Sequence, residues 1–393
     1  MAEWDEISLA QAGTWLSGGT PKTSEENFWG GEIPWISAAS LKDFYIESSD
    51  RNVTKLGAAN GTRLVPPGTL LFIVRGMSLK SEFRMGITQK TVAFGQDCKA
   101  IIPSQDILPL FLAYALKART EEVLGMVDEA GHGTGRLQTE RIEKLAIILP
   151  RSLDEQKATI APLKALDDKI AVNERIAATA EELILAVASG KRWTSRVRLD
   201  EICILSKTQV SPAGMTNTQV DHYSLPAFDA GKSSERVPPE SIKSNKFLIS
   251  SPSVLLSKLN PNIPRVWNVE PHPGVPALAS TEFLVLVPRT GLSPHELWAV
   301  TAEQEFLDTL ASKVTGTSKS HQRVRPDEVL ASQVVDPREF GDVRLAIQDL
   351  ARSVAAMRRE SRTLATLRDT LLPQLMSGRL RVRDAEKIIE DAT

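Results

Sequence analysis

Apolar residues recur at seven-residue steps in residues 151–192. Two rows of this kind, three residues apart, are typical of the a and d positions of a helix that pairs with another helix. Asn173 is a polar residue inside this seam, where a buried amide costs stability but can fix the register of pairing. Pro150 precedes the predicted helix, and Gly190 is expected to end it. The rows consist of Leu163, Ile170, Ala177 and Ile184 and, three residues on, of Leu166, Asn173, Ala180 and Val187.

Residues 338–383 repeat this pattern. Gly378 is expected to end the second helix, and Pro373 is expected to kink or end its last turn, because proline lacks the backbone N–H donor. The main row consists of Leu350, Met357, Leu364 and Leu371, and it is flanked by Ile347, Val354, Leu367 and Leu375.

The two helical stretches belong to a longer internal repeat. Pro150-Arg151 aligns with Pro337-Arg338 at an offset of 187 residues, and Gly133-Thr134-Gly135 has a counterpart in Gly316-Thr317-Ser318. A period of this length indicates domain duplication and not a solenoid. The predicted organisation is a globular domain at 1–150, a central helix within 151–198, a second globular domain at 199–337, and a carboxy-terminal helix and tail at 338–393.

Both globular halves show the patterns of mixed α and β structure. Short apolar runs bounded by Pro, Gly and Asn predict strands within 65–76 and 246–260. Residues 111–127 and 293–312 are predicted to be helical, and Ser293 with Glu296 forms a capping box at the start of the latter. The predicted fold class is α+β, with two mixed domains separated by two long antiparallel helices and related by a pseudo-two-fold internal repeat.

Composition narrows the classes of protein. The 393 residues are 42% hydrophobic and 24% charged, which is typical of a soluble globular chain. We expect no membrane span, because no stretch approaches about 20 apolar residues, and no signal peptide. Cys98 and Cys203 lie far apart and have no CxxC partner, so we expect two buried thiols in a reducing cytoplasm.

Charge follows the repeat. The chain has 47 basic and 49 acidic residues and a net charge of -2. Counted by segment, the net charge is -3 for 1–150, +2 for 151–198, -3 for 199–337 and +2 for 338–393. Neither globular half is basic, so any nucleic-acid surface must be a local patch.

The sequence offers no obvious catalytic apparatus. The motifs of zinc sites, P-loops, dinucleotide folds and serine hydrolases are absent, and we expect neither a metal nor a cofactor on this chain. Asn260-Pro261 is interpreted as a turn. The pairs Asp167-Asp168 and Glu181-Glu182 are interpreted as solvated charges on helix faces.

Basic and polar residues gather in loops at comparable places in both halves. Arg and Lys contact phosphates, and Arg and Asn can also contact base edges; ordinary loop solvation is the alternative. The candidate residues are Arg75, Ser78, Lys80, Arg84, Thr134 and Arg136 in the first half and Lys258, Asn260, Asn262, Arg265, Thr317 and Lys319 in the second.

Several segments together resemble the specificity (S) subunit of type I restriction-modification systems. GGTPKTSEENFWGGEIPWISAASL (18–41), AFGQDCKAIIP (93–103) and GTGRLQTERIEKLAIILP (133–150) resemble a target-recognition domain. The two spacer helices of such an S subunit are resembled by LDEQKATIAPLKALDDKIAVNERI (153–176) and TLRDTLLPQLMSGRLRV (366–382). The second domain departs from the pattern, because VDHYSLPAFDAG (220–231) replaces the expected opening.

The resemblance implies a non-catalytic, cytoplasmic subunit of a phage-defence complex. Each recognition domain would bind one half of a bipartite site in double-stranded DNA. The paired helices would set the spacer and hold two methyltransferase (M) subunits, which carry S-adenosylmethionine, and restriction/motor (R) subunits would complete the complex. The side chains expected to pair the helices are Leu163, Leu166, Ile170, Asn173, Ile184, Leu350, Met357, Leu364 and Leu371.

Two alternatives belong to other classes of protein. A coiled-coil scaffold that only organises protein partners would share the seams and the acidic halves, but it would be indifferent to loss of Arg75, Lys80, Lys258 and Arg265. A methyltransferase would transfer methyl groups without partners. Residues 153–190 as one helix would measure about 57 Å, against about 34–36 Å for a DNA turn, which suits a spacer between two recognition domains.

Overall fold

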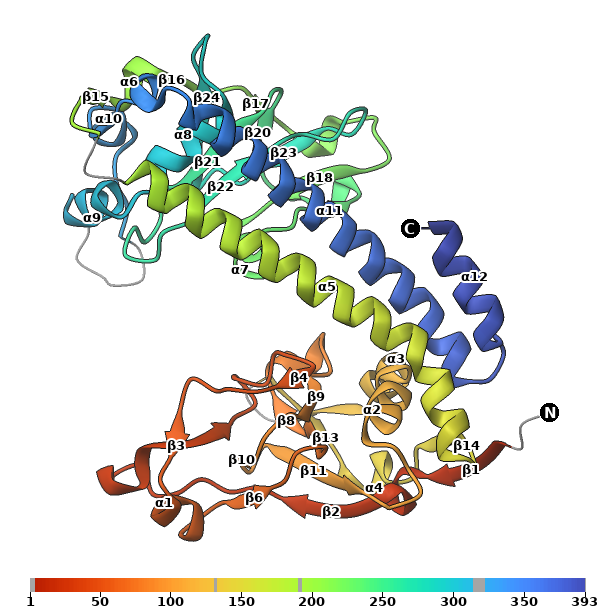
Figure 1. The fold of residues 1–393 in the computed structure, drawn as a ribbon. Helices are drawn as coiled ribbons and strands as arrows, with labels where there is room; N and C mark the ends of the chain where they lie inside the picture. Colours follow the sequence, from red (N-terminus) through yellow and green to blue (C-terminus); the bar gives the residue numbers. More distant parts are fainter. Residues whose placement is uncertain (1–3, 131–132, 190–192, 314–321, 393) are drawn as a thin grey trace. The chain divides into compact units, whose positions relative to one another are not determined.

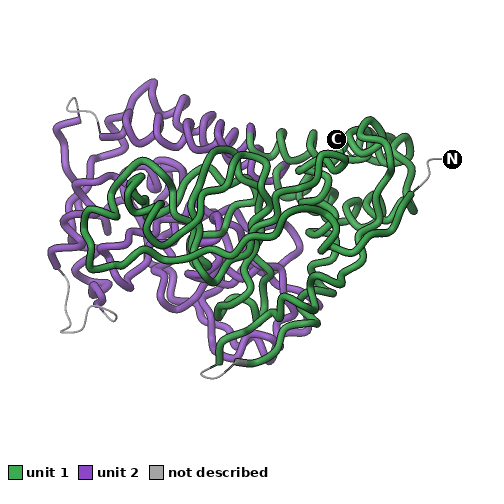
Figure 2. Tube along the Cα trace, turned by 90° about the horizontal axis from the view of Figure 1, so that it is seen from below, with its two compact units in different colours: residues 1–171, 361–393 green, residues 172–360 purple. Residues whose placement is uncertain are grey.

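The computed structural model describes residues 4–130, 133–189, 193–313 and 322–392. Packing divides the chain into two compact units, which Figure 2 shows in separate colours. Unit 1 combines residues 1–171 with 361–393, and unit 2 contains residues 172–360. Each unit therefore contains one globular part and a portion of both long helices.

The described residues of unit 1 form four sheets (Figure 1). The strand orders are β1-β14, β2-β11-β7-β9-β4, β5-β3-β10-β6 and β12-β13-β8. The strands are β1 (Trp4–Ser8), β2 (Gly13–Ser17), β3 (Trp29–Ile36), β4 (Tyr45–Ile46), β5 (Asn52–Val53), β6 (Arg63–Val65), β7 (Leu70–Ile73), β8 (Arg75–Gly76), β9 (Met85–Thr88), β10 (Val92–Phe94), β11 (Cys98–Pro103), β12 (Val127–Ala130), β13 (Thr134–Leu137) and β14 (Ala146–Pro150). The short helices are η1 (Leu9–Ala12), η2 (Glu26–Phe28), α1 (Lys55–Ala59), η3 (Ser78–Lys80), α2 (Pro109–Lys117), α3 (Thr120–Gly125) and α4 (Thr139–Ile142).

Unit 2 has three sheets within its described residues. Their orders are β15-β25, β16-β24-β21-β22 and β17-β20-β23-β18-β19. The strands are β15 (Arg196–Arg198), β16 (Cys203–Ser206), β17 (Gln209–Val210), β18 (Val220–Tyr223), β19 (Glu235–Val237), β20 (Lys246–Ile249), β21 (Ser253–Ser257), β22 (Val266–Val269), β23 (Ala277–Ala279), β24 (Phe283–Pro288) and β25 (Gln333–Val335). The short helices are α6 (Leu199–Ile202), η5 (Pro212–Gly214), α7 (Leu225–Asp229), η6 (Pro239–Ser241), α8 (Pro294–Thr301), α9 (Gln304–Ser312), α10 (Pro326–Leu330) and η7 (Pro337–Phe340).

The two units share one topology, which confirms the internal repeat. The order β2-β11-β7-β9 corresponds to β16-β24-β21-β22, and all pairs in both runs are antiparallel. In the other sheet, β3 pairs parallel with β10 as β18 pairs parallel with β23. Strand β18 belongs to the divergent segment 220–231, so this segment occupies the place of the IPW opening of the first domain.

Some predicted elements differ in detail. The helix predicted at 111–127 is divided into α2 and α3, and the helix predicted at 293–312 is divided into α8 and α9. The capping box at the start of α8 is present, because the Ser293 hydroxyl accepts from the Glu296 backbone and the Glu296 carboxylate accepts from the Ser293 backbone. The strands predicted within 65–76 are present as β7 and β8, and those predicted within 246–260 are present as β20 and β21.

Two long helices, α5 (Leu153–Ala188) and α11 (Val343–Met376), carry the seven-residue rows. In unit 1, Leu163 and Leu166 near the start of α5 share a core with Leu364 and Leu371 near the end of α11. In unit 2, Ala177 and Ala180 of α5 pack with Val354 of α11 and contact Leu350 and Met357. The helices are therefore antiparallel.

The remaining predicted pairing residues also face packed cores. Ile170 packs against the core of unit 1, and Ile184 is fully buried in unit 2. Asn173 is 0% exposed, and its amide donates to Glu360 at 2.8 Å. These two residues are 187 positions apart, so repeat-equivalent positions of α5 and α11 contact each other.

The prediction that Pro373 kinks or ends the last turn of α11 is wrong about the end, since the helix continues to Met376. Leu375 and Met376 are buried in the core of unit 1, which offsets the hydrogen bond that proline cannot make. Gly378 follows with a positive φ of 69°. A Cβ at Gly378 would lie 3.3 Å from the Trp4 ring. Chain direction then reverses into α12 (Val382–Ala392). Gly190 lies outside the described residues.

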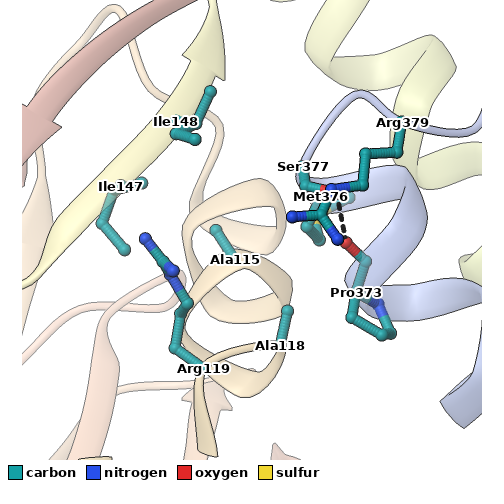
Figure 3. A pocket seen from close by; sticks show the side chains of 9 residues that line it. All are labelled: Ala115, Ala118, Arg119, Ile147, Ile148, Pro373, Met376, Ser377 and Arg379. Carbon is teal, nitrogen blue, oxygen red and sulfur yellow. Dashed lines mark hydrogen bonds between the residues drawn. The ribbon is translucent and has the colours of Figure 1, made fainter. Parts of the chain in front are cut away.

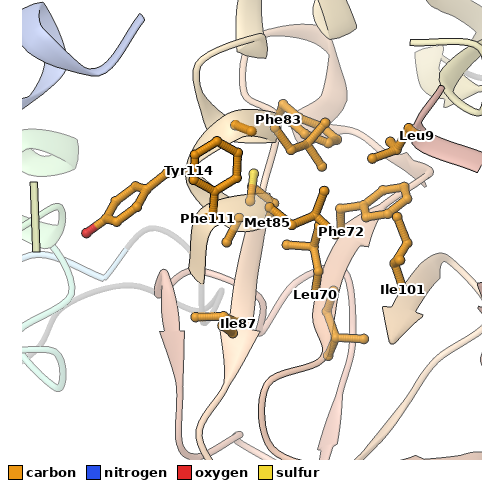
Figure 4. Packing of buried hydrophobic residues seen from close by; sticks show 14 of the residues in the cluster. Leu9, Leu70, Phe72, Phe83, Met85, Ile87, Ile101, Phe111 and Tyr114 are labelled. Carbon is orange, nitrogen blue, oxygen red and sulfur yellow. The ribbon is translucent and has the colours of Figure 1, made fainter. Parts of the chain in front are cut away.

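Each globular part has its own hydrophobic core. In unit 1, Phe72 and Phe111 are fully buried between the five-stranded sheet and α2, as Figure 4 shows. Tyr114 is also fully buried but points from α2 away from this cluster, and its hydroxyl donates to Asp167 of α5. Cys98 and Cys203 are buried free thiols, and burial raises the pKa of each to about 12. Both cysteines are therefore packing residues, as the sequence predicted. The helices of the described chain include none that is long and apolar enough to cross a membrane.

Candidate nucleic-acid interface

The first candidate loop follows the central strand β7 and is held by the small β12-β13-β8 sheet. Arg75 of β8 and Arg136 of β13 are directly opposite each other in an antiparallel pair. Both are exposed, and neither side chain has a hydrogen bond or ion pair with a described residue. Like charges directly opposite in a sheet repel each other. This edge is therefore suited to an anion that would lie between two guanidinium groups.

The rest of this loop is fixed to its neighbours. Lys80 pairs with Glu129 of β12 at 2.8 Å and lowers the pKa of that carboxyl group. Gly135 lies so close to the loop that a Cβ there would be 2.8 Å from the Cβ of Leu79. Ser78 is half-buried at the start of η3, and Met77 is 78% exposed.

Two predicted residues of the first domain are less available. The Arg84 guanidinium is half-buried and pairs with Glu82 at 2.8 Å. Thr134 is half-buried at the start of β13, directly after Gly133, whose φ is 74°. Lys80, Ser78 and Thr134 surround the Arg75–Arg136 pair through β8, η3 and β13, whereas Arg84 belongs to the following loop.

The second domain builds the matching loop differently. The backbone bond from Val324 to the Lys258 carbonyl (3.1 Å) corresponds to the bond from Leu137 to the Val74 carbonyl (2.8 Å). Leu259 bridges to Arg323, so Arg323 occupies the place of Arg136 at the offset of 187. Arg323 is a residue that the search for basic loops missed, although the repeat offset could have identified it.

Arg323 differs from Arg136 because it is already paired. Its guanidinium donates to both oxygens of Glu282, at 2.9 and 3.1 Å. This pairing raises the pKa of Arg323 and lowers that of Glu282. Asp97 occupies the place of Glu282 in the first domain, since it accepts from the Val74 backbone as Glu282 accepts from the Lys258 backbone. The Asp97 side chain has no ion pair with Arg136.

The polar residues of the second loop hold its shape. Asn260 has a φ of 48°, and its backbone donates to the Gln322 carbonyl at 2.8 Å. Asn262 is exposed and donates to the Gln322 side chain at 3.1 Å. Arg265 forms a bidentate pair with Asp229 at 2.7 and 2.8 Å, so its charge is neutralised within the loop.

Lys258 is half-buried and lies close enough to Glu282 to help lower the pKa of that carboxyl group. Thr317 and Lys319 lie outside the described residues. The second loop therefore presents amide groups and a lysine, whereas its arginines at 265 and 323 are bound to carboxylates.

The interpretation of two acidic helix residues as solvated charges is wrong. Asp167 is 8% exposed, and it accepts from Tyr114 at 2.5 Å and from Arg368 at 2.7 Å. Burial of the Tyr114 hydroxyl and the nearby charge of Asp167 raise the pKa of that hydroxyl. The helix pattern could not show this, because Arg368 is 201 residues away in the sequence.

Glu181 has the matching role in unit 2. It pairs with Arg358 of α11 at 2.9 Å and with Lys232 at 3.0 Å. In each unit, a carboxylate of α5 therefore binds α11 and the globular part of the same unit. Asp168 and Glu182 are exposed or nearly so, as predicted, and Lys164 pairs with Asp168 along the helix.

One face of α5 in unit 2 is apolar and uncovered. Val172, Ile176 and Leu183 are 51%, 48% and 50% exposed. Their spacing of four and seven residues places them on one side of the helix. Such a row is suited to a partner helix, because an exposed apolar stripe at this spacing can interdigitate with another stripe of the same kind.

A pocket of about 260 Å³ in unit 1 has no matching chemistry. Figure 3 shows it between α2, β14 and the end of α11. Arg119 on its wall donates to the Ala146 carbonyl at 2.7 Å and pairs with Glu122. The lining brings no acid–base pair together. Clusters of His, Cys, Asp and Glu suited to a metal ion are also lacking within the described residues.

The amino-terminal part of the chain is similar to known proteins. Residues 1–182 match the type I restriction modification DNA specificity domain. The chain is 26% identical over 167 residues, or 42% of its length, to the specificity subunit of type I restriction enzyme EcoR124I/EcoR124II of Escherichia coli. It is 26% identical over 195 residues, or 49% of its length, to the MjaIX specificity subunit of Methanocaldococcus jannaschii. These matches span 41% and 44% of the two relatives, which is less than half of each.

The fold of the whole chain is also found among solved structures. A type I restriction-modification S subunit from M. genitalium superimposes with a TM-score of 0.54, covering 95% of this chain and 96% of that chain. Sequence identity is 13%, so this similarity concerns the fold. The family match covers residues 1–182 of 393, so it is the amino-terminal part of the chain that is similar to the type I restriction modification DNA specificity domain.

Proposed function

We propose that this chain is the DNA-sequence specificity subunit of a type I restriction-modification complex, and that each duplicated domain binds one half of a bipartite target. The observation that carries the proposal is the shared topology, with a fixed polar loop at the same place in each domain. Two domains of one fold and different loop residues are suited to two half-sites of different sequence.

The first loop supports DNA contact through charge. Arg75 and Arg136 are exposed, directly opposite and unpaired, so a backbone phosphate would relieve their mutual repulsion. Ser78 lies beside them and can contact a base edge or a phosphate. In the second loop, the exposed Asn262 offers an amide of the kind that contacts adenine.

The helix pair supports the docking of protein partners. The uncovered face of Val172, Ile176 and Leu183 would pack against a helix of a methyltransferase subunit. In this proposal two such subunits bring S-adenosylmethionine and the methyl-transfer site, and restriction/motor subunits complete the complex. This chain itself is non-catalytic.

The charge distribution supports a model in which this chain and its partner subunits make different contacts with DNA. Both globular domains have a net charge of -3, so the isolated chain would bind DNA weakly. Phosphate contacts supply much of the affinity of DNA-binding proteins and are made by cations. The partner subunits would therefore contribute a large share of the phosphate contacts, and the loops of this chain would contribute selectivity.

The test is methylation-sensitive sequencing of host DNA with and without this gene, in the presence of its methyltransferase partner. We expect a bipartite methylated motif that requires the gene and that appears only when both proteins are present. A methylated motif produced by this chain alone would contradict the non-catalytic role. Active partners that methylate no bipartite motif would contradict the proposal itself.

A further inference from the structure

Each of the two recognition loops exposes a large apolar side chain. Met77 lies two residues beyond Arg75, the partner of Arg136, and is 78% exposed, and Ile263 lies four residues beyond the Leu259 bridge and is 54% exposed. Both lie in the connection that leaves the central strand, β7 in unit 1 and β21 in unit 2. The domains differ widely in sequence and the two positions differ by two residues, yet an exposed large apolar group is present in the same loop of both.

Each apolar side chain sits on a turn that is held in place. The backbone of Ile263 donates to the Asn260 carbonyl at 2.8 Å, and Asn260 is itself bonded to Gln322. The Met77 carbonyl accepts from Lys80, and Ser78 accepts from both Ser81 and Glu82. A turn fixed in this way cannot fold its apolar group back into the core without breaking those bonds. The exposed apolar area is therefore a constant feature of the folded chain.

The surroundings of both side chains are polar and rich in donors. Arg75 and Lys80 flank Met77, and Asn262 adjoins Ile263. An isolated apolar group between hydrogen-bond donors matches the major-groove edge of DNA, where acceptors and donors of the bases lie next to the C5 methyl group of thymine. This methyl group is the apolar feature by which the major groove differs from the minor groove.

We infer that Met77 and Ile263 are specificity-determining residues that pack against thymine C5 methyl groups, one in each half-site. This inference rests on the proposed function and names the base that each loop favours. A wedge between base pairs is the competing use of an exposed apolar residue, but it requires unstacking of the duplex. Packing against a methyl group needs no such deformation and agrees with a turn that is fixed before DNA binds.

The first experiment determines the methylated motif of the complete complex with Met77→Gln or Ile263→Ala. Glutamine keeps the length of methionine and removes its apolar end. We expect Met77→Gln to lower the preference for thymine at one position of one half-site by roughly five- to tenfold, which corresponds to the loss of one base contact. Ile263→Ala should do the same at one position of the other half-site. All other positions should keep their preference.

Matched controls separate this effect from loss of apolar surface in general. Leu56 and Ile204 are 51% and 52% exposed but lie on α1 and β16, away from the loops. Leu56→Ala and Ile204→Ala should leave both half-sites unchanged. If Met77→Gln and Ile263→Ala also leave every position unchanged while the wild-type complex methylates a bipartite motif, the inference is overturned and the proposed function survives.

The second experiment replaces thymine by deoxyuridine at each position whose preference was relaxed, and measures DNA binding by the complete complex. Deoxyuridine lacks only the C5 methyl group. The wild-type complex should lose roughly five- to tenfold in affinity, and the Met77→Gln complex should lose no more. Equal affinity of the wild-type complex for both duplexes would overturn the methyl contact and favour a wedge.

Discussion

The globular parts of the two units have the same fold, but an arginine at the same position has different neighbours in each. In the first domain Arg136 is opposite Arg75, and both are unpaired. In the second domain Arg323 is opposite Leu259 and is bound by Glu282 at 2.9 Å. A duplicated scaffold therefore preserves the position of a guanidinium group while its neighbours decide whether the charge is available. The first loop presents two exposed guanidinium groups without a described partner, and in the second loop the guanidinium group at this position is bound to a carboxylate.

The supports of the two domains also differ. In unit 1, Asp167 is 8% exposed and binds Tyr114 and Arg368. In unit 2, the side chain of Glu181 is 17% exposed, and its partners Arg358 and Lys232 are each 28% exposed. The same kind of ion pair is thus buried more deeply in unit 1, where water can replace less of it.

The largest expected effect comes from changing the connection between the domains. We expect removal of one heptad from α5 between residues 163 and 183, together with the heptad of α11 that packs against it, to change the spacer of the methylated motif. Both half-site sequences should stay the same, because each belongs to one domain. Sequencing of methylated host DNA measures both quantities. A changed half-site with an unchanged spacer would contradict the idea that the helices set the spacing.

The next effect is on stability. We expect Asp167→Ala to lower the free energy of unfolding by about 3 kcal/mol, because the buried Arg368 would keep only the exposed Asp369 as a partner and the buried Tyr114 hydroxyl would keep only Tyr45. Glu181→Ala should cost about 1.5 kcal/mol, since its partners are more exposed. Urea denaturation of the full chain gives both values. Asp167→Asn keeps the hydrogen bond from Tyr114 and should lie between wild type and Asp167→Ala, and equal losses at 167 and 181 would remove the contrast.

Loss of the unpaired arginines should weaken DNA binding. We expect the double substitution Arg75→Ala and Arg136→Ala to reduce the salt dependence of DNA binding by the complex by about two in the slope of log affinity against log salt. Arg84→Ala is the control, because Arg84 is paired with Glu82 and should change the slope little. Assembly with the partner subunits should persist in all variants. An unchanged slope in the double variant would favour a scaffold that does not contact DNA.

A gain of function would sharpen the same comparison. Glu282→Ala removes the carboxylate that binds Arg323, so the second loop would gain one unit of net positive charge. We expect the slope to increase by about one and the affinity at low salt to rise. Asp97→Ala is the matched change in the first domain, where Asp97 has no ion pair with Arg136, and it should have a smaller effect. Weaker binding by the Glu282→Ala complex would show that the ion pair holds the loop in its binding shape.

The smallest expected effect is that of acidic pH on the stability of unit 2. Burial lowers the pKa of both His222 and His295 in unit 2. The charge of Lys246 lowers the pKa of His222 further, whereas Glu235 raises it. For His295, Glu270 and Glu296 raise the pKa and Arg352 lowers it.

A histidine with a depressed pKa stabilises the fold above its unfolded value of 6.5, and this stability is lost as the pH falls through the folded pKa. We expect hydrogen exchange to show that unit 2 loosens before unit 1 as the pH falls below about 6.5. The variant His295→Gln should show less of this loss. Loosening of unit 1 first would contradict the assignment.

Much of the architecture could be predicted because it depends on patterns of residues that lie close together in the sequence. The seven-residue rows identified α5 and α11, and the offset of 187 identified the duplication that the shared topology of the two units confirms. The capping box of Ser293 and Glu296 was readable because both residues lie within one turn. Pro373 does not end α11, since the burial of Leu375 and Met376 offsets the missing hydrogen bond.

The candidate site could be predicted less well, because its contacts join residues that are far apart in the sequence. Arg75 and Arg265 looked alike in sequence as basic residues after an apolar run. Arg265 is bound to Asp229, which is 36 residues away, and Arg75 is opposite Arg136, which is 61 residues away. Periodicity detects neighbours within a few turns and cannot detect these pairs.

The sequence alone thus determined the duplication, the two helices with their seam, the buried cysteines and the place of the two loops. Each of these follows from short-range patterns of apolar spacing and turn residues. Tertiary structure decided which charges are free, since an ion pair forms only where folding brings two distant side chains together. It also decided that Met77 and Ile263 face solvent in the corresponding loops of both domains, because exposure depends on the strands packed around each loop.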